Sequence, residues 1–171
     1  IDAPIHFVEG GRWLEEIELK DLFLPLVVID KSKEVAENPD CILGKQDILD
    51  FEAEHGQIEP GTFVAFRSDW SKRWPSQSAM RNLDDQEIQH TPGWGRDALE
   101  FLIHERGVKA VGHETFDTDA GIPTAEHGLL NEYYLLEQDI YQLEVMTNLD
   151  QLPAKGALIS ISFPNLAQNH G

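Results

Sequence analysis

Four short runs of apolar and β-branched residues divide the chain and predict β-strands. They are residues 24–30 (LPLVVID), 61–68 (GTFVAFRS), 108–114 (VKAVGHE) and 157–163 (ALISISF). β-Branched and aromatic side chains favour strands because they pack well on a pleated surface. Since each run is apolar at most positions rather than at alternate ones, we expect both faces of these strands to be covered.

Segments with apolar residues at helical spacing lie between these strands and predict helices at residues 46–56, 96–107 and 127–146. The first two end at a glycine, which is the usual residue directly after a helix. Strands that alternate with helices are typical of an α/β fold. The chain has no internal repeat and no low-complexity linker, so we expect residues 1–171 to form a single domain.

Residues 70–95 fit neither pattern. They have mixed polarity, two prolines and three of the four tryptophans of the chain. Such a stretch predicts a long surface excursion, and loops of this length are usually functional or disordered.

The charge of the chain excludes two classes of partner. With 13 Lys and Arg against 31 Asp and Glu, the formal net charge is −18, which opposes binding to nucleic acid and to anionic membranes. The acidity favours solubility, and a second interpretation is that it attracts a divalent cation. The single cysteine, Cys41, cannot form an internal disulfide, and no run approaches the ~20 apolar residues of a membrane span. We therefore expect a cytoplasmic protein.

Histidines and carboxylates in several segments are candidate metal ligands, because hydrolytic metal sites combine imidazole nitrogens and carboxylate oxygens. Taken singly, most have a simpler explanation: Asp2 can cap a turn, and His127 can begin a helix. Glu144 differs, because it lies in the apolar stretch QLEVM, where a buried carboxylate is costly unless it is paired or bound to a cation.

The order of these segments resembles the metal-dependent cyclase family, of the bacterial kynurenine formamidase and isatin hydrolase type. The opening IDAPIHF is similar to the end of that family's signature, H-x-G-T-H-x-D-x-P-x-H, and Phe7 stands for the aromatic residue that usually follows. Three later stretches, AFRSDWSKRW, VKAVGHETFDTD and LEVMTNLDQLP, resemble family segments in the same order. The resemblance runs along almost the whole chain and implies an α/β fold with a swivelling β/β/α arrangement, a mixed sheet and flanking helices.

The resemblance also implies roles for individual residues. Asp2, His127 and Glu144 correspond to metal ligands of the family, and His6 corresponds to its proton-transferring residue. The implied cofactor is one or two divalent ions, zinc or manganese, whose bound water attacks an amide carbonyl. His6 would accept a proton and return it to the leaving nitrogen.

The chain departs from the family pattern at three places. The first two histidines of the signature would precede Ile1, so we expect that the chain lacks the family's N-terminal strands and the first half of the motif. His127 and Glu144 are farther apart than in compact members, which leaves Glu126 and Glu137 as competing carboxylates. VGHET places a histidine and a glutamate where many members have isoleucine and aspartate.

Aromatic and polar residues near these segments are candidate substrate contacts. We expect Phe7, Trp70, His113 and Glu114 to contact the substrate, and Trp74 is a further aromatic that could line an apolar pocket or simply pack.

The sequence thus predicts a homodimeric or homotetrameric enzyme that hydrolyses the C–N bond of a cyclic or acyl amide, a small molecule. A related lyase or ester hydrolase on the same scaffold is one alternative. Another is a truncated or inactive member that binds a ligand or a partner, and a third is an acidic α/β domain without metal.

Overall fold

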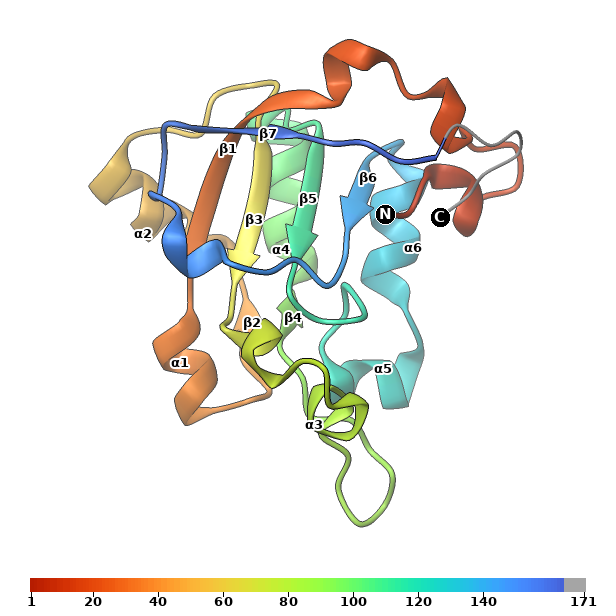
Figure 1. Cartoon of the computed structure of the whole chain (residues 1–171), viewed down its shortest axis with the longest axis vertical. Helices are drawn as coiled ribbons and strands as arrows, with labels where there is room; N and C mark the ends of the chain where they lie inside the picture. Colours follow the sequence, from red (N-terminus) through yellow and green to blue (C-terminus); the bar gives the residue numbers. More distant parts are fainter. Residues whose placement is uncertain (165–171) are drawn as a thin grey trace.

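A five-stranded mixed sheet forms the centre of the protein in a computed structural model that describes residues 1–164 (Figure 1). The strand order is β6-β5-β3-β1-β7. The strands are β1 (Phe23–Asp30), β3 (Phe63–Arg67), β5 (Ala110–His113), β6 (Tyr141–Leu143) and β7 (Ala157–Ser160). The first four are parallel, and β7 pairs antiparallel with β1. A separate two-stranded sheet pairs β2 (Ile42–Leu43) with β4 (Gly93–Trp94).

Helices flank the sheet, as the resemblance implies. They are α1 (Ser32–Glu37), α2 (Lys45–His55), α3 (Gln77–Arg81), α4 (Arg96–Glu100), α5 (Gly121–His127) and α6 (Leu130–Glu137). A π-helical turn, Phe101–Arg106, extends α4, and 3-10 turns form at Pro4–His6, Leu14–Glu16, Leu19–Asp21, Trp70–Arg73 and Leu149–Gln151. Among the described residues, no helix is both long and apolar enough to cross a membrane.

The two faces of the sheet bury different parts of the chain. In β3, Val64 and Phe66 pack with side chains of α2, α4 and α6, whereas Phe63 and Ala65 face the opposite way. That second face is covered by the N-terminal turns and by residues near the C-terminal end of the described chain. This alternation follows from the two-residue period of a strand.

The four predicted strands are confirmed as β1, β3, β5 and β7. The expectation that both faces of these strands are covered is confirmed for β3 and β5, which lie inside the sheet. It is wrong for β7, in which exposed positions alternate with half-buried ones. The reason is that β7 is an edge strand and packs with one face only.

The predicted helix at 127–146 is wrong in its extent. α6 ends at Glu137, Asp139 adopts a left-handed backbone with φ 62°, and the chain then enters β6. Tyr141 is buried there, and its hydroxyl donates to the carbonyl oxygen of Asp21 at 2.6 Å. An apolar run of this kind is compatible with a helix or a strand by its local pattern. Pairing with β5 makes this segment a strand.

The prediction that residues 70–95 form a surface excursion is wrong for the two ends of this segment, which carry Trp70 and Trp94. Trp70, Met80 and Trp94 are fully buried in the core on the helical face. Only Trp74, which is 58% exposed, fits the prediction among the three tryptophans. Because the segment carries its own α3 and β4, it covers the core instead of leaving it.

Candidate functional site

Three carboxylates converge beside the end of β6. Asp2, Glu132 and Glu144 each offer one oxygen, and these oxygens all lie within 4.8 Å of one another. Asp2 belongs to the N-terminal segment, Glu132 to α6, and Glu144 directly follows β6. Figure 1 shows how this is possible, because the N-terminus lies next to β6 and α6.

Gln142 holds two of these carboxylates in place. Its backbone forms an antiparallel bridge with Asp2, with N–H···O distances of 3.0 and 3.2 Å. Its buried side-chain Nε2 donates to Asp2 Oδ2 at 3.0 Å and lies 3.4 Å from Glu144 Oε1. Thr118 Oγ1 donates to the other end of the amide, Oε1. Sequence reasoning missed Gln142, since a lone glutamine in a strand carries no pattern that marks it.

Glu132 was also missed, although its placement has a local cause. Asp119 accepts hydrogen bonds from the backbone N–H groups of Asn131 and Glu132 at 2.9–3.0 Å, which anchors the first turn of α6. This anchoring directs the helix start toward the sheet, and Glu132 is 3% exposed. The competing candidate on the same helix, Glu137, is exposed.

Burial and mutual repulsion make the cluster electrostatically costly. Desolvation, followed by the charges of Asp2 and Glu132, raises the pKa of Glu144 to about 9. Desolvation and the charges of Asp2 and Asp117 raise the pKa of Glu132 to about 8. Glu132 Oε2 has no hydrogen-bond partner among the described residues. A divalent cation would relieve both costs, and carboxylate oxygens are hard ligands that suit one.

His113 ends β5 next to the cluster. Its side chain is 1% exposed, and its Nε2 lies 3.9 Å from Glu144 Oε1. Within the described part of the chain, neither ring nitrogen has a hydrogen-bond partner. Burial lowers the pKa of His113 to about 3, so the imidazole is neutral in the ligand-free protein.

The structure does not bring His127 to the carboxylates. His127 is the last residue of α5, its side chain is 64% exposed, and its Nε2 lies 3.5 Å from Glu126 Oε2. Gly128 follows with φ 76° and turns the chain into α6. In the described chain, Glu132 therefore lies with Asp2 and Glu144 where sequence reasoning expected His127.

The remaining predicted residues have different surroundings. His6 and Phe7 are exposed, and their rings pack edge to face with centroids 5.1 Å apart. Trp70 lies in the core, where its indole Nε1 donates to the carbonyl of Met80 at 2.8 Å. Trp74 lines a surface pocket of about 490 Å³ together with Val145, the residue after Glu144.

Glu114 supports the loop that follows β3. Its buried Oε2 accepts hydrogen bonds from Ser68 N at 2.7 Å and Ser68 Oγ at 3.2 Å, and Oε1 accepts one from Ser71 Oγ. These bonds join the ends of β3 and β5 and use both carboxylate oxygens. In this geometry Glu114 stabilises the fold by joining the ends of β3 and β5, whereas the sequence led us to expect a substrate contact.

Removing the Glu114 carboxylate is expected to destabilise the fold. Glu114→Ala leaves the Ser68 N–H and two hydroxyls without their acceptor, a loss of about 3 kcal/mol in the free energy of unfolding. Glu114→Gln keeps an acceptor oxygen and should retain most of the parent's free energy of unfolding. Urea unfolding of both variants checks this, and equal stability of the alanine variant and the parent would contradict it.

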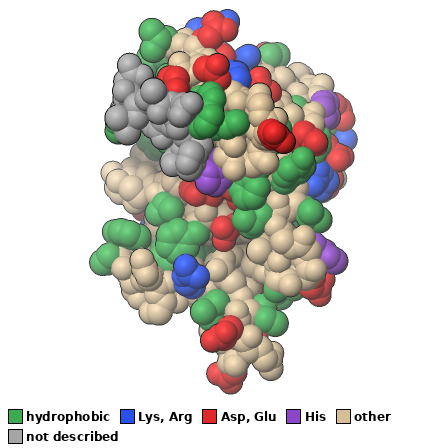
Figure 2. Space-filling view, turned by 90° about the vertical axis from the view of Figure 1, so that its right-hand side faces the viewer, with side chains coloured by type: hydrophobic (Ala, Val, Ile, Leu, Met, Phe, Trp, Pro, Cys, Tyr) green, Lys and Arg blue, Asp and Glu red, His purple; other side chains and the backbone are tan. Residues whose placement is uncertain are grey.

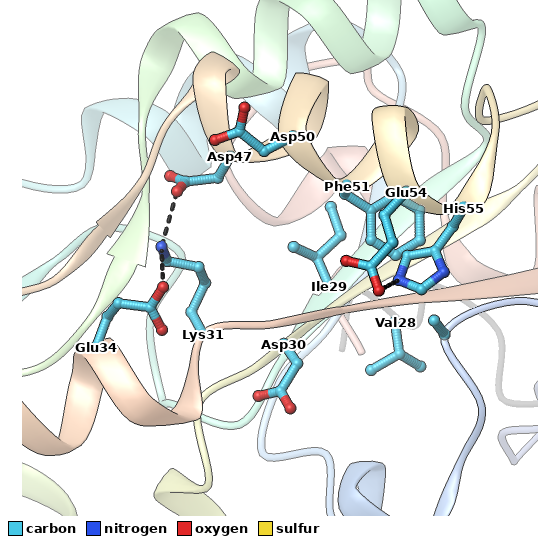
Figure 3. A pocket seen from close by; sticks show the side chains of 11 residues that line it. Val28, Ile29, Asp30, Lys31, Glu34, Asp47, Asp50, Phe51, Glu54 and His55 are labelled. Carbon is cyan, nitrogen blue, oxygen red and sulfur yellow. Dashed lines mark hydrogen bonds and ion pairs between the residues drawn. The ribbon is translucent and has the colours of Figure 1, made fainter.

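A second pocket, beside β1 and α2, has a volume of about 340 Å³ (Figure 3). Lys31 Nζ pairs there with Glu34 at 2.7 Å and with Asp47 at 2.8 Å. Asp50 accepts a hydrogen bond from Gln46, and Asp30 pairs with Arg67 outside the pocket. These charges are satisfied within the protein, so the pocket offers much weaker grounds for a ligand than the carboxylate cluster.

The space-filling view shows how acidic side chains are distributed over one face of the protein. On the face in Figure 2, Asp and Glu side chains are scattered among apolar ones and a smaller number of Lys and Arg. The net charge of −18 is therefore not gathered into one patch on this face.

Comparison with known proteins decides the family. The model of the family described as "Putative cyclase" matches residues 1–120, which is more than half of the chain. The chain belongs to this cyclase family. The resemblance carried by IDAPIHF and the later segments is thereby confirmed. The family is metal-dependent, and the donors of Asp2, Glu132 and Glu144 fit a divalent cation.

Isatin hydrolases are similar to this cyclase-family chain in sequence and structure. The isatin hydrolase of Roseibium aggregatum is 36% identical over 163 residues, covering 92% of this chain and 61% of that protein. Isatin hydrolase A from Ralstonia solanacearum superimposes with a TM-score of 0.92 at 36% identity, covering 99% of this chain and 66% of that one. An isatin hydrolase bound to the product analogue thioisatinate gives a TM-score of 0.90 at 33% identity, with the same coverage. The chain spans less than two thirds of the length of these relatives, and they confirm its fold class.

Proposed function

We propose that this cyclase-family protein is a metal-dependent hydrolase that cleaves the C–N bond of a cyclic or acyl amide. The observation that carries the proposal is the group of three carboxylates within 4.8 Å, two of them buried and one partly buried. Such a group is costly without a cation, and it lies at the carboxyl ends of parallel strands, where α/β folds bind ligands. The name of its relatives, isatin hydrolase, supports a cyclic amide as the substrate class.

Different residues of this chain would bind the metal, orient its ligands and transfer the proton. Asp2, Glu132 and Glu144 would hold zinc or manganese, and the Gln142 amide would keep Asp2 and Glu144 oriented. A divalent ion at such a site acts as a Lewis acid and activates water for attack on a carbonyl. An imidazole nitrogen of His6 is the proposed group that accepts a proton and delivers it to the leaving nitrogen.

Metal analysis tests the proposal with a matched pair on α6. We expect the purified protein to retain one or two equivalents of zinc or manganese. Glu132→Gln should lose the metal, whereas Glu137→Gln, an exposed position on the same helix, should keep it. Assay with isatin then tests hydrolysis.

The outcomes separate the metal site from the reaction. A protein that binds no divalent metal even when zinc and manganese are supplied would contradict the metal site. A protein that binds metal but leaves isatin and simple acyl amides intact would contradict the hydrolase and favour the ligand-binding alternative.

A further inference from the structure

His113 and Glu144 leave neighbouring strands on the same face of the sheet. The register pairs Gly112 of β5 with Leu143 of β6, so the next residues of the two strands extend side by side. Val111, two residues before His113, packs in the core on the helical face. The imidazole therefore points to the face on which α6 carries Glu132, and its Nε2 is 3.9 Å from Glu144 Oε1.

The imidazole is a polar group without a partner in the described protein. A separation of 3.9 Å is too long for a hydrogen bond, and neither ring nitrogen has another partner in the described chain. Leaving a buried polar group unpaired costs about 1–3 kcal/mol. An aliphatic side chain would fill this strand position without that cost, so the contacts of the described residues do not explain a histidine here.

The surrounding backbone keeps His113 in this position. Met146 N donates to the carbonyl oxygen of His113 at 2.9 Å, and Val145 N donates to that of Thr115 at 3.1 Å. Val145 is a β-branched residue with φ 51°, a conformation that such residues rarely adopt. These contacts hold the segment after Glu144 against the end of β5, so the two side chains are fixed relative to each other.

We propose that His113 is a substrate contact whose Nε2–H donates a hydrogen bond to an oxygen of the amide substrate bound beside Glu144. This inference rests on the proposed hydrolase function and adds to it a residue that selects substrates with an acceptor oxygen at this place. A site that hydrogen-bonds a substrate oxygen discriminates against analogues without one, because its own polar group would stay buried and unpaired.

Three variants test this role with isatin as the probe. In His113→Leu we expect the KM for isatin to rise about fivefold or more, which corresponds to the loss of one hydrogen bond. His113→Gln carries an amide N–H near the Nε2 position and should restore much of the affinity. His104→Leu, an exposed histidine outside the site, should leave the KM unchanged.

Stability and metal content supply readouts that do not depend on turnover. Because the imidazole has no hydrogen-bond partner among residues 1–164, ligand-free His113→Leu should melt at the same temperature as the parent or a few degrees higher, with unchanged metal content. A lower melting temperature, or an unchanged KM in an active protein, would overturn the role of His113 alone. A metal-loaded parent that neither hydrolyses nor binds isatin would overturn both the hydrolase function and this contact.

Discussion

Glu144→Gln is expected to stabilise the metal-free protein and to abolish its metal binding. Burial and the charges of Asp2 and Glu132 raise the pKa of Glu144 to about 9. At neutral pH, burying this carboxyl group in the folded state therefore costs free energy. An uncharged amide at the same position does not carry that cost. We expect a gain on the order of 2 kcal/mol in the free energy of unfolding, measured by urea titration in the presence of a chelator.

The same cluster predicts how stability depends on pH. In the unfolded chain Glu132 and Glu144 titrate near 4.5, the ordinary pKa of a glutamate, and in the folded protein their pKa values lie near 8 and 9. Between these values the folded state holds more protons, so the stability of the metal-free protein should fall as the pH rises from about 5 to 9. Added zinc or manganese should flatten this decline, because the cation replaces the protons.

Melting temperatures across this pH range check the dependence. Glu144→Gln should decline less steeply than the parent, and Glu137→Gln, which changes an exposed carboxylate, should follow the parent. A metal-free parent whose melting temperature stays constant from pH 5 to 9 would contradict the electrostatic cost that we assign to the cluster.

Trp70→Ala is expected to cause a large loss of stability. The indole is 1% exposed, donates a hydrogen bond to Met80 and lies 3.6 Å below the Arg73 guanidinium. Truncating a buried tryptophan to alanine costs about 3–5 kcal/mol, through lost apolar burial and the cavity left behind. Trp70→Phe keeps a ring in the core and should lose clearly less.

Denaturant unfolding of these variants also tests the sequence interpretation of Trp70. Trp74→Ala serves as the control, because its side chain is 58% exposed and its loss should change stability little. If Trp70→Ala kept its stability but lost affinity for isatin, Trp70 would be a substrate contact, as the sequence suggested, and its structural role would be contradicted.

Much of the sheet and two helices could be predicted because their signals are local. The apolar runs of β1, β3 and β5 are short and rich in β-branched residues, which favours strands, and the helix at 46–56 ends at Gly56, which has φ 81°. The opening IDAPIHF was informative for a different reason, since a motif with defined spacing indicates a family without any knowledge of contacts. The zinc or manganese preference, the proton transfer by His6, the oligomeric state and the cytoplasmic location stay predictions.

The composition of the site was decided by tertiary structure. Asp2 and Gln142 are 140 residues apart in the chain and meet through a backbone bridge, and Glu132 joins them because Asp119 anchors the start of α6. His127, the more obvious ligand by residue type, ends a helix at the surface. By itself the sequence determined the family and the inner strands, and it singled out Asp2 and Glu144, two of the three carboxylates that converge in the structure. Strand order and helix placement decided the third, because a sequence pattern reports only which face of its own element a side chain occupies, and convergence depends on how elements pack.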